Sequence, residues 1–210
     1  MTHKEAISQE IFTIISQASK KLDIKSYVIG GFVRDYFLKR GTAKDIDIVT
    51  VGSGIDLANQ VSKMLPKKPK VQVFKTYGTA MLRFQDIEIE FVGARKESYV
   101  EESRNPEVSE GTLEDDQNRR DFTINALALS LNEEDFGELV DPFEGMKDLQ
   151  SQVIKTPLNP DITYSDDPLR MMRAIRFATQ LGFQIEENSL VAITKNTARL
   201  EIITKERIVD

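Results

Sequence analysis

Two aspartates at alternate positions are the residues of this chain best suited to chemistry. Asp45 and Asp47 enclose Ile46 at the start of an apolar run, Ile46–Val51, that is typical of a strand. Side chains repeat every two residues along a strand, so both carboxylates share one face, about 6.5–7 Å apart. Carboxylates paired in this way suit divalent metal ions and in-line attack on a phosphate. The pattern alone is also typical of a solvated strand face.

A pair of glycines precedes these aspartates. The apolar run Tyr27–Ile29 ends at Gly30-Gly31, and an amphipathic helix is predicted over Phe32–Lys39. A strand–Gly-Gly–helix junction lets backbone N–H groups approach an anion closely and points a helix N-terminus at it. The alternative is an ordinary tight turn. Together with the aspartates, the glycines predict a phosphate cradle beside a metal-binding face.

A third carboxylate is expected from a neighbouring strand. Glu88 and Glu90 alternate with apolar residues in the predicted strand Ile87–Val92, so both glutamates lie on one face. Either glutamate can supply the third metal ligand, and a solvated strand face is the alternative.

Residues 119–126, with the sequence R-R-D-F-T-I-N-A, form a second constellation. Arg119 and Arg120 can clamp phosphates bidentately, and Asp121 suits the cap of a helix that starts there. Asn125 offers both a donor and an acceptor, useful near a ribose or a phosphate. As bare sequence, R-R-D is also a common charged turn.

A basic helix is predicted near the end of the chain, at Pro168–Leu181. Asp167 suits its N-cap, because proline favours the first helical position. Arg170, Arg173 and Arg176 recur every three residues and so follow one side of the helix. A capped helix with an exposed basic stripe explains this pattern without any ligand.

Composition excludes several classes of site. The 210 residues contain no cysteine and one histidine, His3, which excludes disulfides, thiolate metal sites and histidine general bases. No apolar run approaches the ~20 residues of a membrane span, and a signal-peptide core is missing, so we expect a cytoplasmic protein without a membrane partner. The net charge of −6 favours a small anionic ligand, or a macromolecule held on a restricted basic patch such as Lys63–Lys75.

Periodicity predicts strands and helices that follow one another along the chain. Besides the strands already named, strands are predicted at Val71–Phe74, Thr79–Phe84, Glu138–Val140 and Val153–Lys155. Further helices are predicted at residues 3–22, Ser53–Leu65, Met146–Leu149 and Asn188–Lys195. The polar, acidic stretch Lys96–Asn118 has no periodicity and is predicted to be a long loop.

Two prolines in Thr156–Asp161 indicate a boundary between a catalytic domain, residues 1–155, and a helical segment, residues 156–210. The segment from Thr204 to the end reads as a helix without a cap, so we expect a truncated segment and a longer parent protein.

The motifs resemble those of class II tRNA nucleotidyltransferases and bacterial poly(A) polymerases, in the same order, from about Tyr27 to Phe183. The resemblance implies an α/β (α+β) fold: a nucleotidyltransferase head with a small mixed sheet flanked by helices, followed by the start of an all-helical, RNA-binding neck. It implies transfer of CMP or AMP from CTP or ATP to the 3′ end of tRNA, with release of pyrophosphate. Poly(A) polymerase and enzymes adding only CC or only A share these motifs, so they stay open as alternatives. A nucleotide-binding module without catalysis is a further alternative.

The same resemblance assigns roles to residues. It favours Glu90 over Glu88 as the third ligand, with Asp45 and Asp47, for two Mg²⁺ ions. It implies nucleotide-binding roles for a set of glycine, arginine, aspartate and asparagine residues: Gly30, Gly31, Arg34, Arg95, Arg119, Arg120, Asp121, Asn125, Asp167, Arg170, Arg173 and Arg176. Triphosphate recognition then uses features within residues 1–210, whereas tRNA, a large A-form ligand, is expected to bind this chain weakly by itself.

Base selection is expected from Asp167 and Arg170. A carboxylate accepts hydrogen bonds and a guanidinium donates them, which matches the exocyclic amine and ring acceptor of cytosine and adenine. Uracil and guanine present a carbonyl and a ring N–H at those positions, so the pair would reject them. The family's E-D-x-x-R element has a glutamate where this chain has Asp166, which leaves the role of Asp166 open.

Overall fold

A computed structural model describes residues 2–41, 44–98 and 107–203, and its centre is a seven-stranded mixed sheet in the order β3-β4-β5-β2-β1-β8-β9. The strands are β1 (Lys25–Ile29), β2 (Asp45–Val51), β3 (Gln72–Phe74), β4 (Thr79–Phe84), β5 (Ile87–Gly93), β8 (Ala128–Ser130) and β9 (Leu139–Val140). β2 and β5 are parallel, and the other neighbours are antiparallel. The α/β class and the mixed sheet predicted from the sequence are confirmed.

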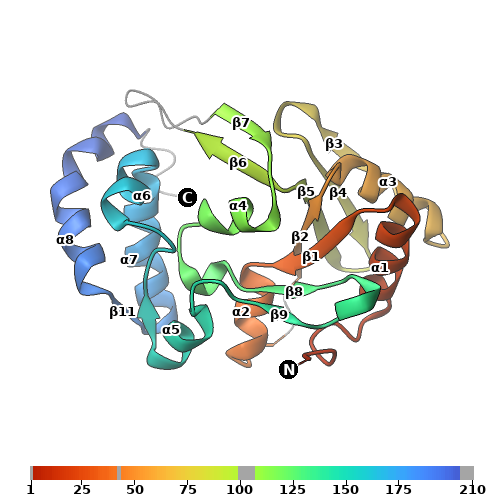
Figure 1. Cartoon of the computed structure of the whole chain (residues 1–210), viewed down its shortest axis with the longest axis horizontal. Coiled ribbons are helices and arrows are strands. Elements are labelled where there is room, and N and C mark those ends of the chain that lie inside the picture. The colour runs from red at the N-terminus through yellow and green to blue at the C-terminus, as the bar shows by residue number, and fades with distance from the viewer. Residues whose placement is uncertain (1, 42–43, 99–106, 204–210) are drawn as a thin grey trace.

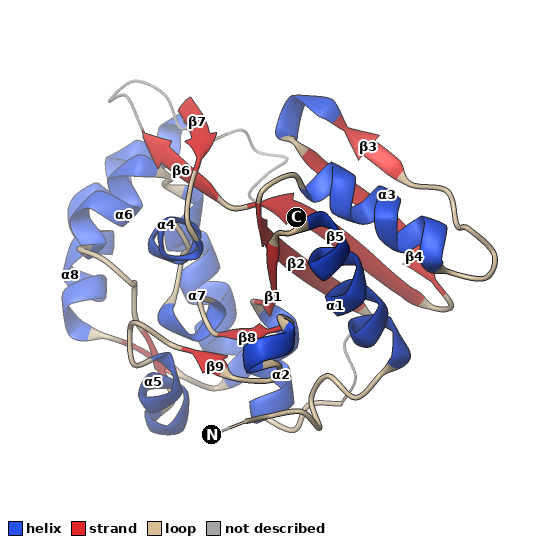
Figure 2. Ribbon diagram, turned by 45° about the vertical axis from the view of Figure 1, so that its right-hand side comes forward, coloured by secondary structure: helices blue, strands red, loops and turns tan. Residues whose placement is uncertain are grey.

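Helices cover one face of this sheet. They are α1 (Glu10–Leu22), α2 (Gly31–Phe37) and α3 (Gly54–Met64), and α1 and α3 lie side by side against the strands (Figure 2). Ile46 and Ile48 of β2 point into the main core, where they are buried with apolar residues of these helices. Because strand side chains alternate, Asp45 and Asp47 face the other side of the sheet.

The opposite face carries the stretch that was predicted to be a loop, and that prediction is wrong. Lys96–Asn118 contributes most of a hairpin, β6 (Arg95–Ser98) with β7 (Glu107–Glu110), and the helix α4 (Leu113–Asn118); residues 99–106 lie outside the described part. Thr112 and Asp115 form a reciprocal capping box at the start of α4. Leu113 packs against a small second core that includes Val49 of β2. Tertiary packing and capping therefore order a stretch whose sequence has no periodicity.

Helices dominate the remainder of the described chain (Figure 1). The elements there are α5 (Gly145–Ser151), β10 (Val153–Ile154), α6 (Pro160–Asp166), α7 (Leu169–Leu181), β11 (Gln184–Ile185), α8 (Glu187–Asn196) and a 3-10 helix η4 (Thr197–Ile202). β10 and β11 pair in parallel, so this segment is not purely helical and one strand pair spans the predicted boundary at residue 155. α6 was not predicted; Asn159 caps it and Pro160 occupies its first turn.

The first helix also differs, because it begins at Glu10 and not at residue 3. The predicted helix after Thr204 lies outside the described residues. Among the helices that the structure describes, none has the length and apolarity needed to cross a membrane.

Candidate active site

The strand register brings acidic side chains together on the open face of the sheet. In the parallel β2–β5 pair, Asp47 is opposite Glu90 and Asp45 is opposite Glu88. Asp47 and Glu90 both line a cavity of about 500 Å³, whereas Asp45 and Glu88, the next pair on the same face, are not among its lining residues. The cavity therefore separates Glu90, which lines it, from Glu88, which does not; the alternation of residues in the sequence cannot make this distinction.

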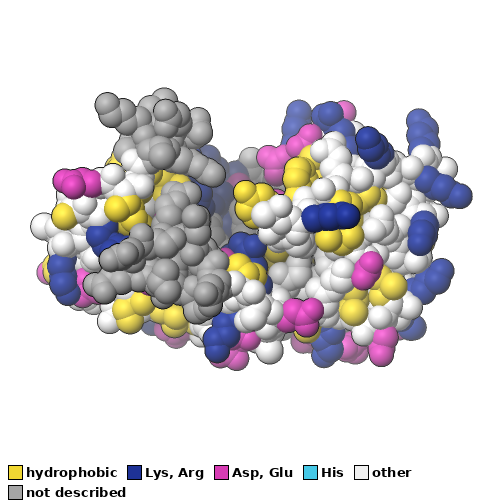
Figure 3. Space-filling view, turned by 90° about the horizontal axis from the view of Figure 1, so that it is seen from above, with side chains coloured by type: hydrophobic (Ala, Val, Ile, Leu, Met, Phe, Trp, Pro, Cys, Tyr) yellow, Lys and Arg dark blue, Asp and Glu magenta, His cyan; other side chains and the backbone are white. Residues whose placement is uncertain are grey.

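Arginines and aromatic residues complete the wall of this cavity, the catalytic cavity. Its lining residues are Asp47, Phe74, Tyr77, Thr79, Met81, Glu90, Val92, Arg95, Arg119 and Arg120. Seen from above, the molecule is hollowed between the C-terminal helices and the side that carries β3 (Figure 3). Five of the ten lining residues, among them the exposed Tyr77 at 70%, were not foreseen from the sequence.

Burial and like charge act together on the acidic pair. Burial raises the pKa of Asp47 above its ordinary value, the Arg120 guanidinium opposes this shift, and the Asp45 carboxylate adds to it. Desolvation likewise raises the pKa of Glu90, and the charge of Asp47 adds to that shift. Proximity to a divalent cation would relieve this repulsion.

The donor set fits a hard divalent ion such as Mg²⁺. Among residues 2–41, 44–98 and 107–203, no three Asp, Glu, His or Cys side chains converge into a ready-made metal site. Mg²⁺ is usually held by one or two carboxylates together with substrate phosphates and water, not by an all-protein cage. Asp45 and Asp47, on one face of one strand, supply such a pair.

Gly30 lies against these groups at the turn between β1 and α2. Its backbone angles, φ 83° and ψ −136°, are rarely adopted by residues with a side chain. A Cβ placed on Gly30 would lie 3.1 Å from Arg120 Nη1 and 3.4 Å from Asp47 Oδ2. The absence of a side chain at Gly30 therefore permits the backbone turn and leaves room for the side chains of Arg120 and Asp47 beside it.

Two buried carboxylates hold the three arginines of the catalytic cavity. Glu97 Oε1 lies 3.0 Å from Arg95 Nε and 3.3 Å from Arg119 Nη1. Asp116 Oδ1 lies 2.5 Å from Arg119 Nη2, and Asp116 Oδ2 lies 3.1 Å from Arg120 Nε. Sequence reasoning missed both carboxylates because they belong to the stretch predicted to be a loop. The one signal in the sequence was the position of Asp116, three and four residues before the two arginines.

Other predicted nucleotide-binding residues bind one another away from the catalytic cavity. Asp121 Oδ2 accepts from Arg173 Nε at 2.7 Å, and Asp121 Oδ1 accepts from Asn125 Nδ2 at 3.0 Å. Arg34 Nη1 in turn donates to Asn125 Oδ1 at 2.7 Å, and the Arg34 guanidinium lies over the Phe177 ring. The predicted helix cap at Asp121 is therefore wrong, since no side-chain cap precedes the 3-10 helix η2 (Thr123–Asn125) and Asp121 binds Arg173 of α7 instead.

The proposed base-reading residues lie beside a smaller hollow of about 240 Å³. Arg170, Asp166 and Arg119 line it, whereas Asp167 is not among its lining residues. Asp167 Oδ1 accepts from the N–H of Leu169 at 3.2 Å. The predicted N-cap at Asp167 is nevertheless wrong, because α7 begins at Leu169 with Pro168 at its N-cap position, and Asp167 is the C-cap of α6. Arg170 Nη2 donates to the carbonyl of Arg119 at 2.7 Å, so this hollow adjoins the catalytic cavity.

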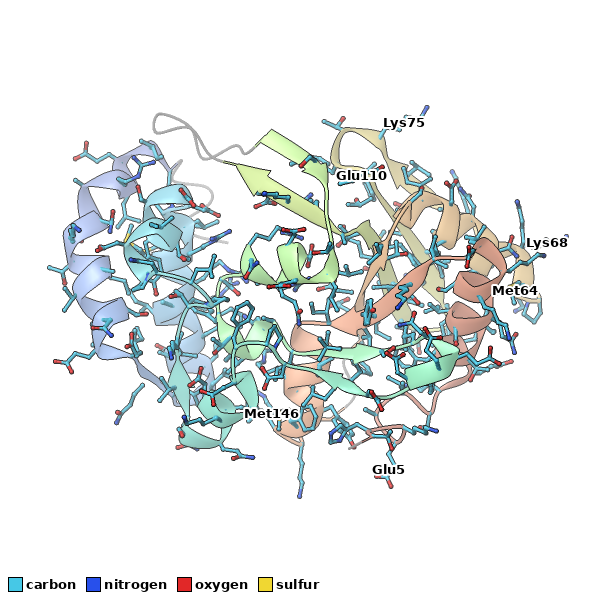
Figure 4. All side chains as sticks on the ribbon, viewed as in Figure 1. Glu5, Met64, Lys68, Lys75, Glu110 and Met146 are labelled. Carbon is cyan, nitrogen blue, oxygen red and sulfur yellow. The ribbon has the colours of Figure 1, made fainter. Side chains whose placement is uncertain are left out.

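Arg176, the last of the three arginines on α7, is exposed and lies over the Phe177 ring at 5.9 Å. Lys75 projects from the end of β3, on the side of the molecule that carries the exposed aromatic residues Phe74 and Tyr77 (Figure 4).

Comparison with known families gives two matches in this chain. Residues 26–155 match the family described as "Poly A polymerase head domain". Residues 182–210 match the family described as "Probable RNA and SrmB- binding site of polymerase A".

Individual proteins are similar over most of the chain. An A-adding tRNA nucleotidyltransferase of Aquifex aeolicus is 39% identical over 166 residues, covering 79% of this chain and 20% of the relative. A CCA-adding enzyme of Bacillus velezensis is 38% identical over 185 residues, covering 87% of this chain and 44% of the relative. A solved tRNA nucleotidyltransferase, complexed with a primer tRNA and an incoming ATP analog, superposes with a TM-score of 0.80 at 32% identity and covers 93% of this chain and 54% of its own. The chain thus spans from a fifth to about half of the length of these proteins.

Proposed function

Because the chain belongs to the poly A polymerase head domain family, we propose that it catalyses nucleotidyl transfer from CTP or ATP to the 3′ end of tRNA. Relatives described as CCA-adding and A-adding enzymes support this substrate class. The observation that carries the proposal is the catalytic cavity, in which Asp47 and Glu90 face Arg95, Arg119 and Arg120.

The proposed metal ligands are Asp45, Asp47 and Glu90, for two Mg²⁺ ions. When bound, such ions activate the attacking hydroxyl and stabilise charge on the phosphates. Support comes from the register of β2 and β5, which places Asp47 opposite Glu90. Burial, and secondarily a neighbouring carboxylate, raises the pKa of both Asp47 and Glu90.

The protein's own groups then position the reaction. The arginines of the catalytic cavity would hold the triphosphate by bidentate, charge-assisted hydrogen bonds. The 3′-hydroxyl oxygen bonds to the α-phosphorus, the bond from that phosphorus to the bridging oxygen breaks, and pyrophosphate leaves. The hydroxyl proton passes to solvent water, because Asp47 and Glu90 are proposed to be ionised metal ligands.

Selection of the base is proposed for the hollow that adjoins Arg119. Arg170 lines it and can donate to the ring acceptor of cytosine or adenine. Two carboxylates are candidates to complete the pair: Asp167, which matches the family pattern, and Asp166, which lines the hollow with Arg170. Variants of both residues separate these two assignments.

The end of the tRNA is proposed to approach from the β3 side of the catalytic cavity. Phe74 and Tyr77 line that side with exposed rings, and stacking on aromatic rings is a sequence-tolerant way to hold an unpaired base. The exposed lysines between Lys63 and Lys75 add positive charge for phosphates. A cytoplasmic location accompanies this proposal and would be tested by cell fractionation.

The decisive experiment is an extension assay with labelled nucleotides. A tRNA lacking CCA and a tRNA lacking only the final A are each incubated with ATP, CTP or both, beside an Asp47→Asn control. Incorporation of both nucleotides into the first tRNA supports CCA addition. Addition of A to the second tRNA with no incorporation of C into the first supports the A-adding alternative that the Aquifex relative suggests. Repeated adenylation of unrelated RNA would support a poly(A) polymerase. ATP binding without incorporation on any RNA would favour the non-catalytic module.

A further inference from the structure

We propose that Glu97 and Asp116 are positioning residues that set the spacing of the three arginines for a triphosphate. This inference rests on the proposed function. Along the cavity wall the charges alternate in the order Arg95, Glu97, Arg119, Asp116, Arg120, with every neighbouring pair within 3.3 Å. Arg119 is shared by both carboxylates and lies in the middle of the series.

These two carboxylates differ from those of surface ion pairs because they are buried. The Asp116 side chain is 0% exposed and the Glu97 side chain 4%, whereas the three arginines are partly exposed toward the cavity. An exposed ion pair contributes little, but a buried charge must keep its partner. Each carboxylate therefore keeps its ion pairs with the arginines. The arginines contact the carboxylates on their buried side and line the cavity on their exposed side.

The chemistry of guanidinium makes this arrangement useful for phosphates. Each guanidinium has five N–H donors in a rigid fork, so it can keep a carboxylate partner and still donate to a phosphate oxygen. A long side chain fixed in advance loses little freedom when the ligand binds. The short segments that carry the carboxylates, β6 and α4, lie next to each other on the open face of the sheet (Figure 1).

Two effects of the carboxylates oppose each other. Their negative charge weakens the attraction between arginine and phosphate. Their hydrogen bonds to Arg119 and Arg120, and the ion pair of Glu97 with Arg95, fix the arginine geometry. If positioning dominates, neutral isosteres weaken triphosphate binding; if simple neutralisation dominates, the isosteres strengthen it. The sign of the change therefore decides between the two roles.

The test measures direct binding of ATP, ADP and AMP to Glu97→Gln and Asp116→Asn. We expect ATP affinity to fall roughly 10- to 100-fold, as for loss of a charge-assisted hydrogen bond. AMP affinity should change less than about threefold, because one phosphate cannot span the three arginines. The matched control is Glu114→Gln, an exposed carboxylate of α4, which should retain the parental ratio of the AMP and ATP dissociation constants.

Each outcome is decisive when folding is checked by circular dichroism and thermal melting. If Asp116→Asn fails to fold, Glu97→Gln carries the test, because its partners Arg95 and Arg119 include one end of the series. A folded variant whose ratio equals the parental one, or which binds ATP more tightly, overturns the inference and leaves the proposed function intact. A parent chain that binds ATP no better than AMP overturns both.

Discussion

Asp121 and Arg173 form an ion pair that joins the arginine-rich motif to helix α7, with Asp121 Oδ2 at 2.6 Å from Arg173 Nη2. The two residues are 52 positions apart, and Asp121 is 8% exposed. Asn125 and Arg34 extend the contact back to the Gly30 turn through hydrogen bonds. The pair thus connects the sheet, which carries the acidic residues, to the helix that carries Arg170.

Arg173→Ala should therefore reduce stability more than nucleotide affinity. Removing the arginine leaves Asp121 mostly buried without its charged partner, at a cost of about 1–3 kcal/mol. Urea unfolding measures the change, and Arg176→Ala, an exposed arginine on the same helix, is the control with an expected change within about 0.5 kcal/mol. Equal stability of the two variants, with a higher ATP dissociation constant for Arg173→Ala alone, would instead place Arg173 at the nucleotide.

Glu90→Gln should lower the rate of nucleotide incorporation about 100-fold or more, because Glu90 faces Asp47 in the catalytic cavity. Glu88 lies two residues before Glu90 on the same strand, opposite Asp45, and Glu88→Gln should keep most of the parental rate. Removing a like charge beside Asp47 should leave the melting temperature unchanged or raised. Single-turnover kinetics measure the rates, and the reverse order of the two variants would make Glu88 the third carboxylate.

Divalent metal and nucleotide added together should raise the free energy of unfolding, whereas either ligand alone should raise it only weakly. The acidic side chains do not form a complete cage in the described residues, so phosphate oxygens must supply the missing ligands. With both ligands at 100 times their dissociation constants, stabilisation of about 2.7 kcal/mol per site is expected, and chelation should abolish it. Thermal melts with Mg²⁺, ATP, both, and both plus chelator measure this, and full stabilisation by Mg²⁺ alone would contradict it.

Arg170→Ala should reduce discrimination against UTP and GTP. Loss of a buried hydrogen-bonding partner corresponds to about 1–3 kcal/mol, or roughly 5- to 150-fold in the ratios of kcat/KM among the four nucleotides. Asp166→Asn and Asp167→Asn, measured in parallel, identify the carboxylate that acts with it. If Arg170→Ala lowers the melting temperature while all four ratios stay parental, Arg170 has only a structural role in α7.

Gly30→Ala should lose both stability and activity, because the new Cβ strains the backbone and displaces Arg120. Gly182→Ala is the control, since Gly182 also has a positive φ of 70°, but a Cβ placed there would have no atom of the described residues within 4 Å. Both variants should be destabilised by about 1 kcal/mol or more. Only Gly30→Ala should lose ATP affinity. If that variant binds ATP as tightly as the parent, Gly30 serves the backbone turn and has no role in nucleotide binding.

Local sequence determined the acidic face of the sheet. Alternation along each strand placed Asp45 with Asp47, and Glu88 with Glu90, on one face of its own strand, because strand geometry repeats every two residues. The pairing of β2 with β5 then put both acidic pairs on the same face of the sheet. The order of the motifs indicated the family and the mixed sheet. These features depend on neighbours in sequence, which is why they could be predicted.

Only the tertiary structure decided how the charged residues pair. Glu97 and Asp116 belong to short elements whose order comes from packing and capping, so no periodic signal marked them. The place of Glu90 in the cavity beside Asp47, without Glu88, came from the fold, and the partner of Asp121 came from a helix far along the chain. Asp116 pairs with residues only three and four positions away, but the complete burial of its side chain comes from the fold. The pairs of Glu97 with Arg119 and of Asp121 with Arg173 join separate segments, and such pairs are specified by geometry and desolvation, which a linear pattern of residue types does not contain.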